Sequence, residues 1–257
     1  MKILFIADIV GEPGRAVIAK GLPGLFGREN PDLIIANAEN SAGGKGLTSP
    51  IAKELFSLGI DVITLGNHTF DRKEIENTID DPKVLRPANY PPGVPGKGWN
   101  IYKTKSGHKV AVINIMGRVY MPVIDDPFRA VSDIIDKVKA ETKIIFVDFH
   151  AEITSEKQTM GWFLDGRVSA CVGTHTHIPT ADERVLPGGT AYLTDAGMTG
   201  PAEGVIGMDK EIILKKYLTG IPQHFSVAKG GSLMQGCVVE INESDGKAKS
   251  IKRFSIS

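Results

Sequence analysis

Gly66-Asn67-His68 places an amide and an imidazole directly after a mostly apolar run, Ile60 to Leu65. A short apolar run that ends at a glycine is typical of a buried strand. Glycine at this position lets the backbone turn tightly and approach another group closely. Asparagine and histidine are also ordinary turn residues, so the tripeptide alone does not define a site.

Four more groups of polar residues follow other strand-like runs. Ligand sites in open α/β sheets form beyond the carboxyl ends of the strands, so five distant segments can meet at one place. Each group alone has an ordinary explanation, such as a solvated turn or a buried histidine, and it is the joint pattern that indicates a site. His175 and His177 are two residues apart on a segment that we expect to be extended. Because side chains alternate along an extended chain, both rings would point to one face. The candidate residues are Asp8, Glu39, Asn40, Asn67, His68, His150, His175 and His177.

Carboxylate, amide oxygen and imidazole are suitable ligands for divalent iron or manganese, with zinc as the alternative. No cysteine lies in any of the groups, which excludes a structural cysteine–zinc site. The groups offer more ligands than one catalytic ion with an open position would use. We therefore expect two divalent transition-metal ions about 3.5–4 Å apart, bridged by one carboxylate. A bridging water would ionise near neutral pH and act as the nucleophile, and the net positive centre would attract a phosphate.

The elements that position these groups alternate early in the chain. Strands are predicted over Lys2–Ala7, Asp32–Ala38 and the run before Gly66, with helices between them. This alternation indicates parallel strands covered by helices. The first helix is expected from Arg15 to about Glu29, broken or kinked near Pro23.

Later elements add antiparallel character. Hairpins are predicted for Trp99–Lys105 with Lys109–Ile115, for Glu183–Thr194, and for the tail strands Cys237–Ile241 and Lys249–Ser255. Two mixed sheets packed face to face, with helices on both outer sides, would accommodate the whole pattern. A single doubly wound sheet is the alternative. The remaining predicted elements are a polar helix Asp71–Thr78, helices Pro127–Ala140 and Ser155–Leu164, and strands Lys143–Phe149 and Val168–Val172.

Length and composition limit the class of protein. The 257 residues show no repeat or linker, and we predict one domain, residues 1–257. Lys plus Arg and Asp plus Glu number 30 each, which argues against a protein that coats duplex nucleic acid or an anionic membrane. Two cysteines in apolar runs favour a reducing cytoplasm. The apolar run Ile3–Ala7 is too short for a signal peptide or a membrane span. A homo-oligomer is compatible with all of this.

The order of the polar groups resembles the calcineurin-like metallophosphoesterases over nearly the whole chain. That superfamily begins with Asp-x-His and continues with Gly-Asp, whereas this chain has Asp8-Ile9-Val10 and Ala38-Glu39-Asn40. Together with Asp148-Phe149-His150-Ala151-Glu152 and Gly173-Thr174-His175-Thr176-His177, these departures resemble the YmdB branch.

The resemblance implies a four-layer α/β/β/α sandwich and a di-iron or di-manganese phosphodiesterase that acts on 2′,3′-cyclic nucleotides. By the same resemblance, Glu39 bridges the two ions and His68 is the general acid that protonates the leaving oxygen. Asn40 would stand in for the missing histidine of the first motif. The implied ligands are Asp8, Asn40 and His177 for one ion, and Asn67, His150 and His175 for the other.

Two other functions remain open from the residues. One is a non-catalytic, metal-dependent regulator that senses nucleotides, and the other is a phosphomonoesterase. The residues that bind substrate are unknown from the sequence. The loop around Arg118 and Tyr120 is one candidate wall, although a solvated loop is the simpler interpretation. His108 and His224 are assigned to the surface.

Overall fold

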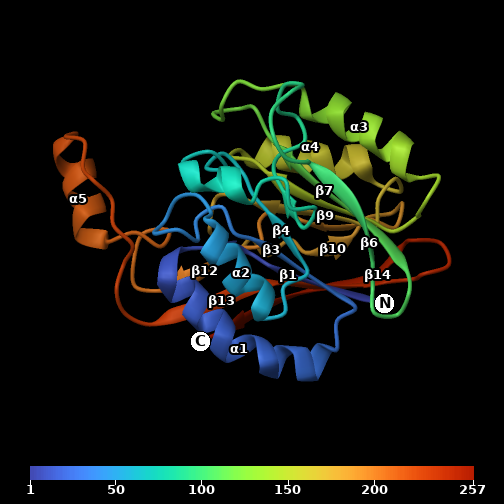
Figure 1. The fold of residues 1–257 in the computed structure, drawn as a ribbon, viewed down its shortest axis with the longest axis horizontal. Helices are drawn as coiled ribbons and strands as arrows, with labels where there is room; N and C mark the ends of the chain where they lie inside the picture. The colour runs from blue at the N-terminus through green and yellow to red at the C-terminus, as the bar shows by residue number, and fades with distance from the viewer.

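The computed structural model describes residues 1–257 and contains two β-sheets packed face to face (Figure 1). The first sheet has eight strands and is formed mainly by the two ends of the chain. Its spatial order is β2 (Asp8–Ile9), β12 (Met198–Pro201), β13 (Ser232–Ile241), β1 (Lys2–Ile6), β3 (Leu33–Asn37), β4 (Val62–Thr64) and β5 (Val84–Leu85), with β14 (Ala248–Ile256) paired to β13.

The second sheet has six strands and comes from the middle of the chain. Both sheets are mixed: β1 pairs parallel with β3 and antiparallel with β13, and the central strands of the second sheet run parallel with antiparallel strands at both edges. The order of the second sheet is β10 (Arg184–Val185), β11 (Ala191–Leu193), β9 (Ala170–Thr174), β8 (Ile145–His150), β7 (Lys109–Met116) and β6 (Trp99–Lys103).

Helices cover both outer faces, so the layers are α/β/β/α, as the sequence predicts. Helices α1 (Gly11–Glu29) and α2 (Ser49–Ser57) share an apolar cluster with the first sheet. Helices α3 (Pro127–Val138) and α4 (Thr154–Leu164) share another with the second sheet. The alternative of one doubly wound sheet is wrong, because strands β6 to β11 form a separate sheet.

A third apolar cluster fills the space between the two sheets. Within it, Phe5 of β1 packs against Phe146 of β8, with ring centroids 5.3 Å apart. Both rings are fully buried. This core holds the sheets so that the carboxyl ends of β1, β3, β4, β8 and β9 lie at one edge of the molecule.

The predicted break in the first helix is wrong. Helix α1 runs without interruption from Gly11 to Glu29 and includes Pro23. Pro23 lies on the exposed side of the helix, where water can bond the carbonyl group that a proline leaves free. The buried side carries the apolar residues Val17, Ile18, Leu22 and Leu25, whose packing on the sheet outweighs the local effect of the proline.

Several elements differ from their predicted form. The polar segment Asp71–Thr78 contains only the short 3₁₀ helix η1 (Lys73–Asn77). Helix α5 (Lys210–Thr219) and strand β12 were not predicted, and α5 extends away from the two sheets (Figure 1). The predicted hairpins all form, with strand limits shifted by a few residues. None of the helices combines the length and apolar character needed to span a membrane.

Candidate metal centre

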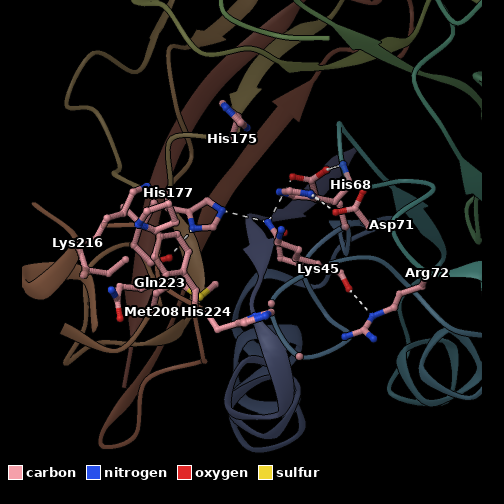
Figure 2. Close-up of a pocket in the computed structure, with 18 residues that line it drawn as sticks. Lys45, His68, Asp71, Arg72, His175, His177, Met208, Lys216, Gln223 and His224 are labelled. Atoms are coloured by element: carbon pink, nitrogen blue, oxygen red, sulfur yellow. Dashed lines mark hydrogen bonds and ion pairs between the residues drawn. The ribbon is translucent and has the colours of Figure 1, made fainter. Parts of the chain in front are cut away.

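The eight candidate residues meet at the edge where the five strands end. Five of them line one cavity of about 870 Å³ (Figure 2). Of the other three, Asp8 and His150 contact these lining residues, and Asn67 contacts His150. The cavity-lining candidates are Glu39, Asn40, His68, His175 and His177.

Glu39 lies at the centre of the cluster and is almost fully buried. Its Oε1 lies 3.0 Å from Nε2 of His150 and 3.3 Å from Nδ2 of Asn40. Its Oε2 accepts a hydrogen bond of 3.0 Å from the backbone N–H of His68. One carboxylate therefore contacts residues on both sides of the cluster.

On one side of Glu39, His150 is the shared neighbour. Nε2 of His150 lies 3.0 Å from Oδ1 of Asn67 and 3.1 Å from Nδ1 of His175. Glu39, His150 and His175 each offer a donor atom within 4.8 Å of the others, which is close enough for one ion to contact all three. Imidazole nitrogen and carboxylate oxygen are common ligands of transition metals.

On the other side, His177 lies between Asn40 and Asp8. Nε2 of His177 is 3.1 Å from Nδ2 of Asn40 and 3.8 Å from Oδ1 of Asp8. The second oxygen of Asp8 accepts a hydrogen bond from the backbone N–H of His175. Oδ1 of Asp8 is buried without any hydrogen-bond partner, which is rare for a buried carboxylate and fits a position next to a cation.

A buried relay fixes the orientation of His150. Its Nδ1 lies 2.9 Å from Oγ1 of Thr174, and this hydroxyl donates to Asp148 at 2.7 Å. Asp148 is fully buried and also accepts hydrogen bonds from Thr64 and Asn37. Such outer contacts set the tautomer of a histidine and leave its other nitrogen available for a ligand.

The other two histidines are oriented in the same way. Nε2 of His175 lies 2.8 Å from Oε2 of Glu152, and Nδ1 of His177 lies 2.9 Å from the carbonyl oxygen of Ile206. In both rings the remaining nitrogen faces the cluster. All three histidines of the cluster therefore present one nitrogen to the same region.

Gly66 confirms the close approach expected at the end of β4. A Cβ at this position would lie 2.3 Å from the ring of His150 and 2.5 Å from Oε2 of Glu39. No real side chain tolerates such distances, so only glycine lets the two strands bring their polar residues together.

The expectation that His175 and His177 lie on an extended segment is wrong. Strand β9 ends at Thr174, and the two histidines have positive φ angles of 99° and 65°. Non-glycine residues rarely adopt this left-handed region, and it is costly unless surrounding contacts enforce it. The tertiary contacts of the loop, rather than strand alternation, bring both rings to the cavity.

Burial and neighbouring charges shift the pKa values of three residues in the cluster. Burial alone would raise the pKa of Glu39, but the charge of nearby His150 and their hydrogen bond outweigh it and lower this pKa to about 2. Burial would lower the pKa of His150, yet the charge of Glu39 outweighs it and raises this pKa to about 9. Burial raises the pKa of Asp8 to about 6. Binding of a cation would therefore displace a proton from His150.

His68 lies apart from the ring nitrogens of the cluster. Its Nδ1 is 2.8 Å from Oδ2 of Asp71, and its side chain lines the cavity at 27% exposure. Sequence reasoning missed Asp71, although its spacing of three residues from His68 was a usable signal.

The walls of the cavity come largely from segments that had no predicted role. They include Lys45 and Arg72 on one side and eight residues of the segment 206–225 on the other. His224, assigned only to the surface, is exposed but lines this cavity. The loop around Arg118 does not line it, and Arg118 pairs instead with Asp126.

The two-sheet sandwich and the carboxylate–histidine cluster at its strand ends define a protein of the metallophosphoesterase type. A family model described as YmdB-like protein matches residues 4–254, and the chain belongs to this family.

Three similar proteins cover the full chain. A 2′,3′-cyclic-nucleotide 2′-phosphodiesterase from Bacillus subtilis strain 168 is 50% identical over 258 residues, which is 100% of this chain and 97% of that protein. The crystal structure of a hypothetical protein from Thermus thermophilus shares 40% identity with a TM-score of 0.93, covering 100% of this chain and 99% of that one. The crystal structure of a phosphatase from Mycoplasma pneumoniae shares 34% identity with a TM-score of 0.94, covering 100% of this chain and 93% of that one.

Proposed function

We propose that this protein is a metal-dependent phosphodiesterase that hydrolyses 2′,3′-cyclic nucleotides. The observation that carries the proposal is the position of Glu39, whose carboxylate contacts residues in both halves of one ligand cluster. Membership of the YmdB-like family and the name of the Bacillus subtilis relative support the substrate class.

In this proposal two divalent ions, iron or manganese with zinc as the alternative, bind on either side of Glu39. The bound ions would lower the pKa of a water molecule and offset the charge that builds up on the phosphate. Asp8, Asn40 and His177 would hold one ion, and Asn67, His150 and His175 would hold the other. The unpartnered oxygen of Asp8 supports the first set, and the close group of Glu39, His150 and His175 supports the second.

His68 would supply the proton for the leaving oxygen. Asp71 accepts the hydrogen on Nδ1, so a protonated His68 has Nε2–H available for the substrate in the cavity. Water adds to phosphorus and releases a proton to the solvent, the bond from phosphorus to the 2′ oxygen breaks, and this oxygen takes the proton from His68. His68 then regains a proton from the solvent. The product is a nucleoside 3′-monophosphate, in line with the 2′-phosphodiesterase name of the relative.

A phosphomonoesterase is the second candidate, because the Mycoplasma pneumoniae structure is described as a phosphatase. The equal numbers of basic and acidic residues, 30 each, favour a small substrate over duplex nucleic acid in either case.

A substrate panel tests the proposal. Protein stripped of metal and reloaded with Mn²⁺, Fe²⁺ or Zn²⁺ is assayed with 2′,3′-cyclic nucleotides, linear diesters and nucleoside monophosphates. We expect the highest kcat/KM for the 2′,3′-cyclic substrates and none without metal. Faster release of phosphate from the monoesters would favour the second candidate, and binding without turnover of any substrate would show a regulator.

A further inference from the structure

One wall of the cavity carries an aromatic ring that no other aromatic ring covers. This wall belongs to the segment of residues 206–225, here called the 206–225 arm, which includes helix α5. Phe225 lines the cavity and remains 42% exposed, so part of its ring is free to contact a ligand. Nζ of Lys216, from α5, lies 4.9 Å from the centre of its ring.

The arm is anchored at its base, so the ring has a defined position. The backbone N–H of Asp209 donates to the carbonyl of Ser226, and that of Ala228 donates to the carbonyl of Gly207, both at 2.9 Å. Next to this paired base, the carbonyl of Ile206 holds the ring of His177. Because Ser226 directly follows Phe225, these contacts fix the chain at Phe225 close to His177 of the candidate metal centre.

The opposite wall packs against the same base. A Cβ on Gly44 would lie 2.9 Å from Cε of Met208, so the loop that carries Gly44 and Lys45 meets the 206–225 arm at the cavity. Figure 2 shows Met208, Lys216, Gln223 and His224 grouped near His177, while Arg72 lies on the far side. The cavity therefore has an aromatic and polar wall on the arm side and a basic wall opposite it.

We propose that Phe225 is the stacking surface for the base of the nucleotide substrate. An exposed ring beside a polar cavity offers a flat apolar face to any base, and the cation of Lys216, which also lines the cavity, stabilises the ring by a cation–π contact. Gln223 and His224, which lie next to Phe225 and line the cavity, offer donors and acceptors to the base edge. The ligand is a nucleoside 2′,3′-cyclic phosphate, with purines preferred because they stack over a larger area. This assignment rests on the proposed function.

The test compares substrates with and without a base. Phe225→Leu is assayed with adenosine 2′,3′-cyclic phosphate and with glycerol 1,2-cyclic phosphate, which keeps the cyclic diester but has no base. We expect kcat/KM for the nucleotide to fall about 5- to 150-fold, the range that base–aromatic stacking supplies. We expect the value for the glycerol compound to stay within about twofold, because it makes no stacking contact. Phe225→Trp should retain activity toward the nucleotide.

Tyr217→Leu is the matched control, because Tyr217 is an 80% exposed aromatic residue on the same arm that does not line the cavity. It should leave both substrates unaffected. An equal loss for both substrates in Phe225→Leu, or no loss for either, would overturn the assignment.

A binding measurement separates this inference from the proposed function. Saturation-transfer NMR with adenosine 3′-monophosphate needs no turnover, and we expect the strongest transfer at the base protons, reduced in Phe225→Leu but not in Tyr217→Leu. If the wild type hydrolyses nothing but shows this pattern, the proposed function fails and the base site stands. Base protons with no more transfer than the ribose protons in the wild type would rule out the base site.

Discussion

At the scale of single residues, His68 is set apart from the other candidates by its partner. Its ring contacts Asp71, not the ligand cluster, while its backbone holds Glu39. We predict that His68→Ala keeps its metal content and loses about 10²–10⁴-fold in kcat, the contribution of a positioned acid. A substrate with a nitrophenolate leaving group should be affected least, since it needs no proton. His108→Ala serves as the control, and loss of metal in His68→Ala would contradict the assigned role.

Glu39 is the residue with contacts in both halves of the site. Glu39→Gln keeps the shape and can still accept the hydrogen bond from His68, but it removes the charge that both ions would share. We predict near-complete loss of hydrolysis with the fold intact, measured by activity and circular dichroism. Glu39→Asp should not restore full activity, because Asn40 stays placed for the longer side chain.

Glu54→Gln is the control for this pair of variants, since Glu54 is an exposed glutamate in an ion pair with Arg15. Near-normal turnover by Glu39→Gln at saturating metal would defeat the bridging role and leave Asp8 as the shared ligand.

At the scale of elements, a buried ion pair contacts the residues on both sides of His175 in the strained loop after β9. Nζ of Lys157, in α4, donates to the carbonyl of Thr174 and to Asp195, and Asp195 accepts from both the N–H and the hydroxyl of Thr176. Lys157 and Asp195 are both 1% exposed. The residues on each side of His175 are therefore fixed by one ion pair, which explains how the loop keeps its left-handed angles.

We predict that Lys157→Met lowers both the melting temperature and the affinity for Mn²⁺, since it leaves the buried charge of Asp195 without its counter-ion. Breaking a buried pair in this way costs about 3–5 kcal/mol. The double variant with Asp195→Leu should recover much of the stability, because apolar pairs can replace buried ions, but not the affinity, because Thr176 loses its acceptor. Lys109→Met, at an exposed ion pair, is the control. Wild-type affinity in the double variant, measured by calorimetry, would show that the pair is only structural.

The elements also show what a sequence can and cannot indicate. Apolar runs identified the main strands, and a polar residue at the end of a buried strand needs no tertiary information to be recognised. Continuity of α1 through Pro23 depended on packing against the sheet, which local propensity does not contain. The angles at His175 depend on Lys157 and Asp195, which lie 18 residues before it and 20 after it in the sequence. Contacts between residues that are distant in the sequence also determine which segments form the wall of the cavity.

At the scale of the whole molecule, the two sheets share one core, and the candidate metal centre lies across their common edge. We proposed a single domain, residues 1–257, and the structure suggests a test through Phe146, which packs on Phe5 between the sheets. Phe146→Ala should destabilise the protein by about 3–5 kcal/mol. It should lower the melting temperature of a single unfolding transition, and circular dichroism and fluorescence should report the same value. Val123→Ala, at a fully exposed side chain, should leave the transition unchanged. Two separate transitions, only one of them shifted, would show that the sheets unfold independently.

The central claim is that two ions bind on either side of Glu39. The most direct measurement is anomalous diffraction at the manganese edge from crystals of protein loaded with Mn²⁺. The account predicts two peaks, one beside His150 and His175 and one beside Asp8 and His177, with the Glu39 carboxylate between them. A single peak, or peaks that do not contact Glu39, would contradict it.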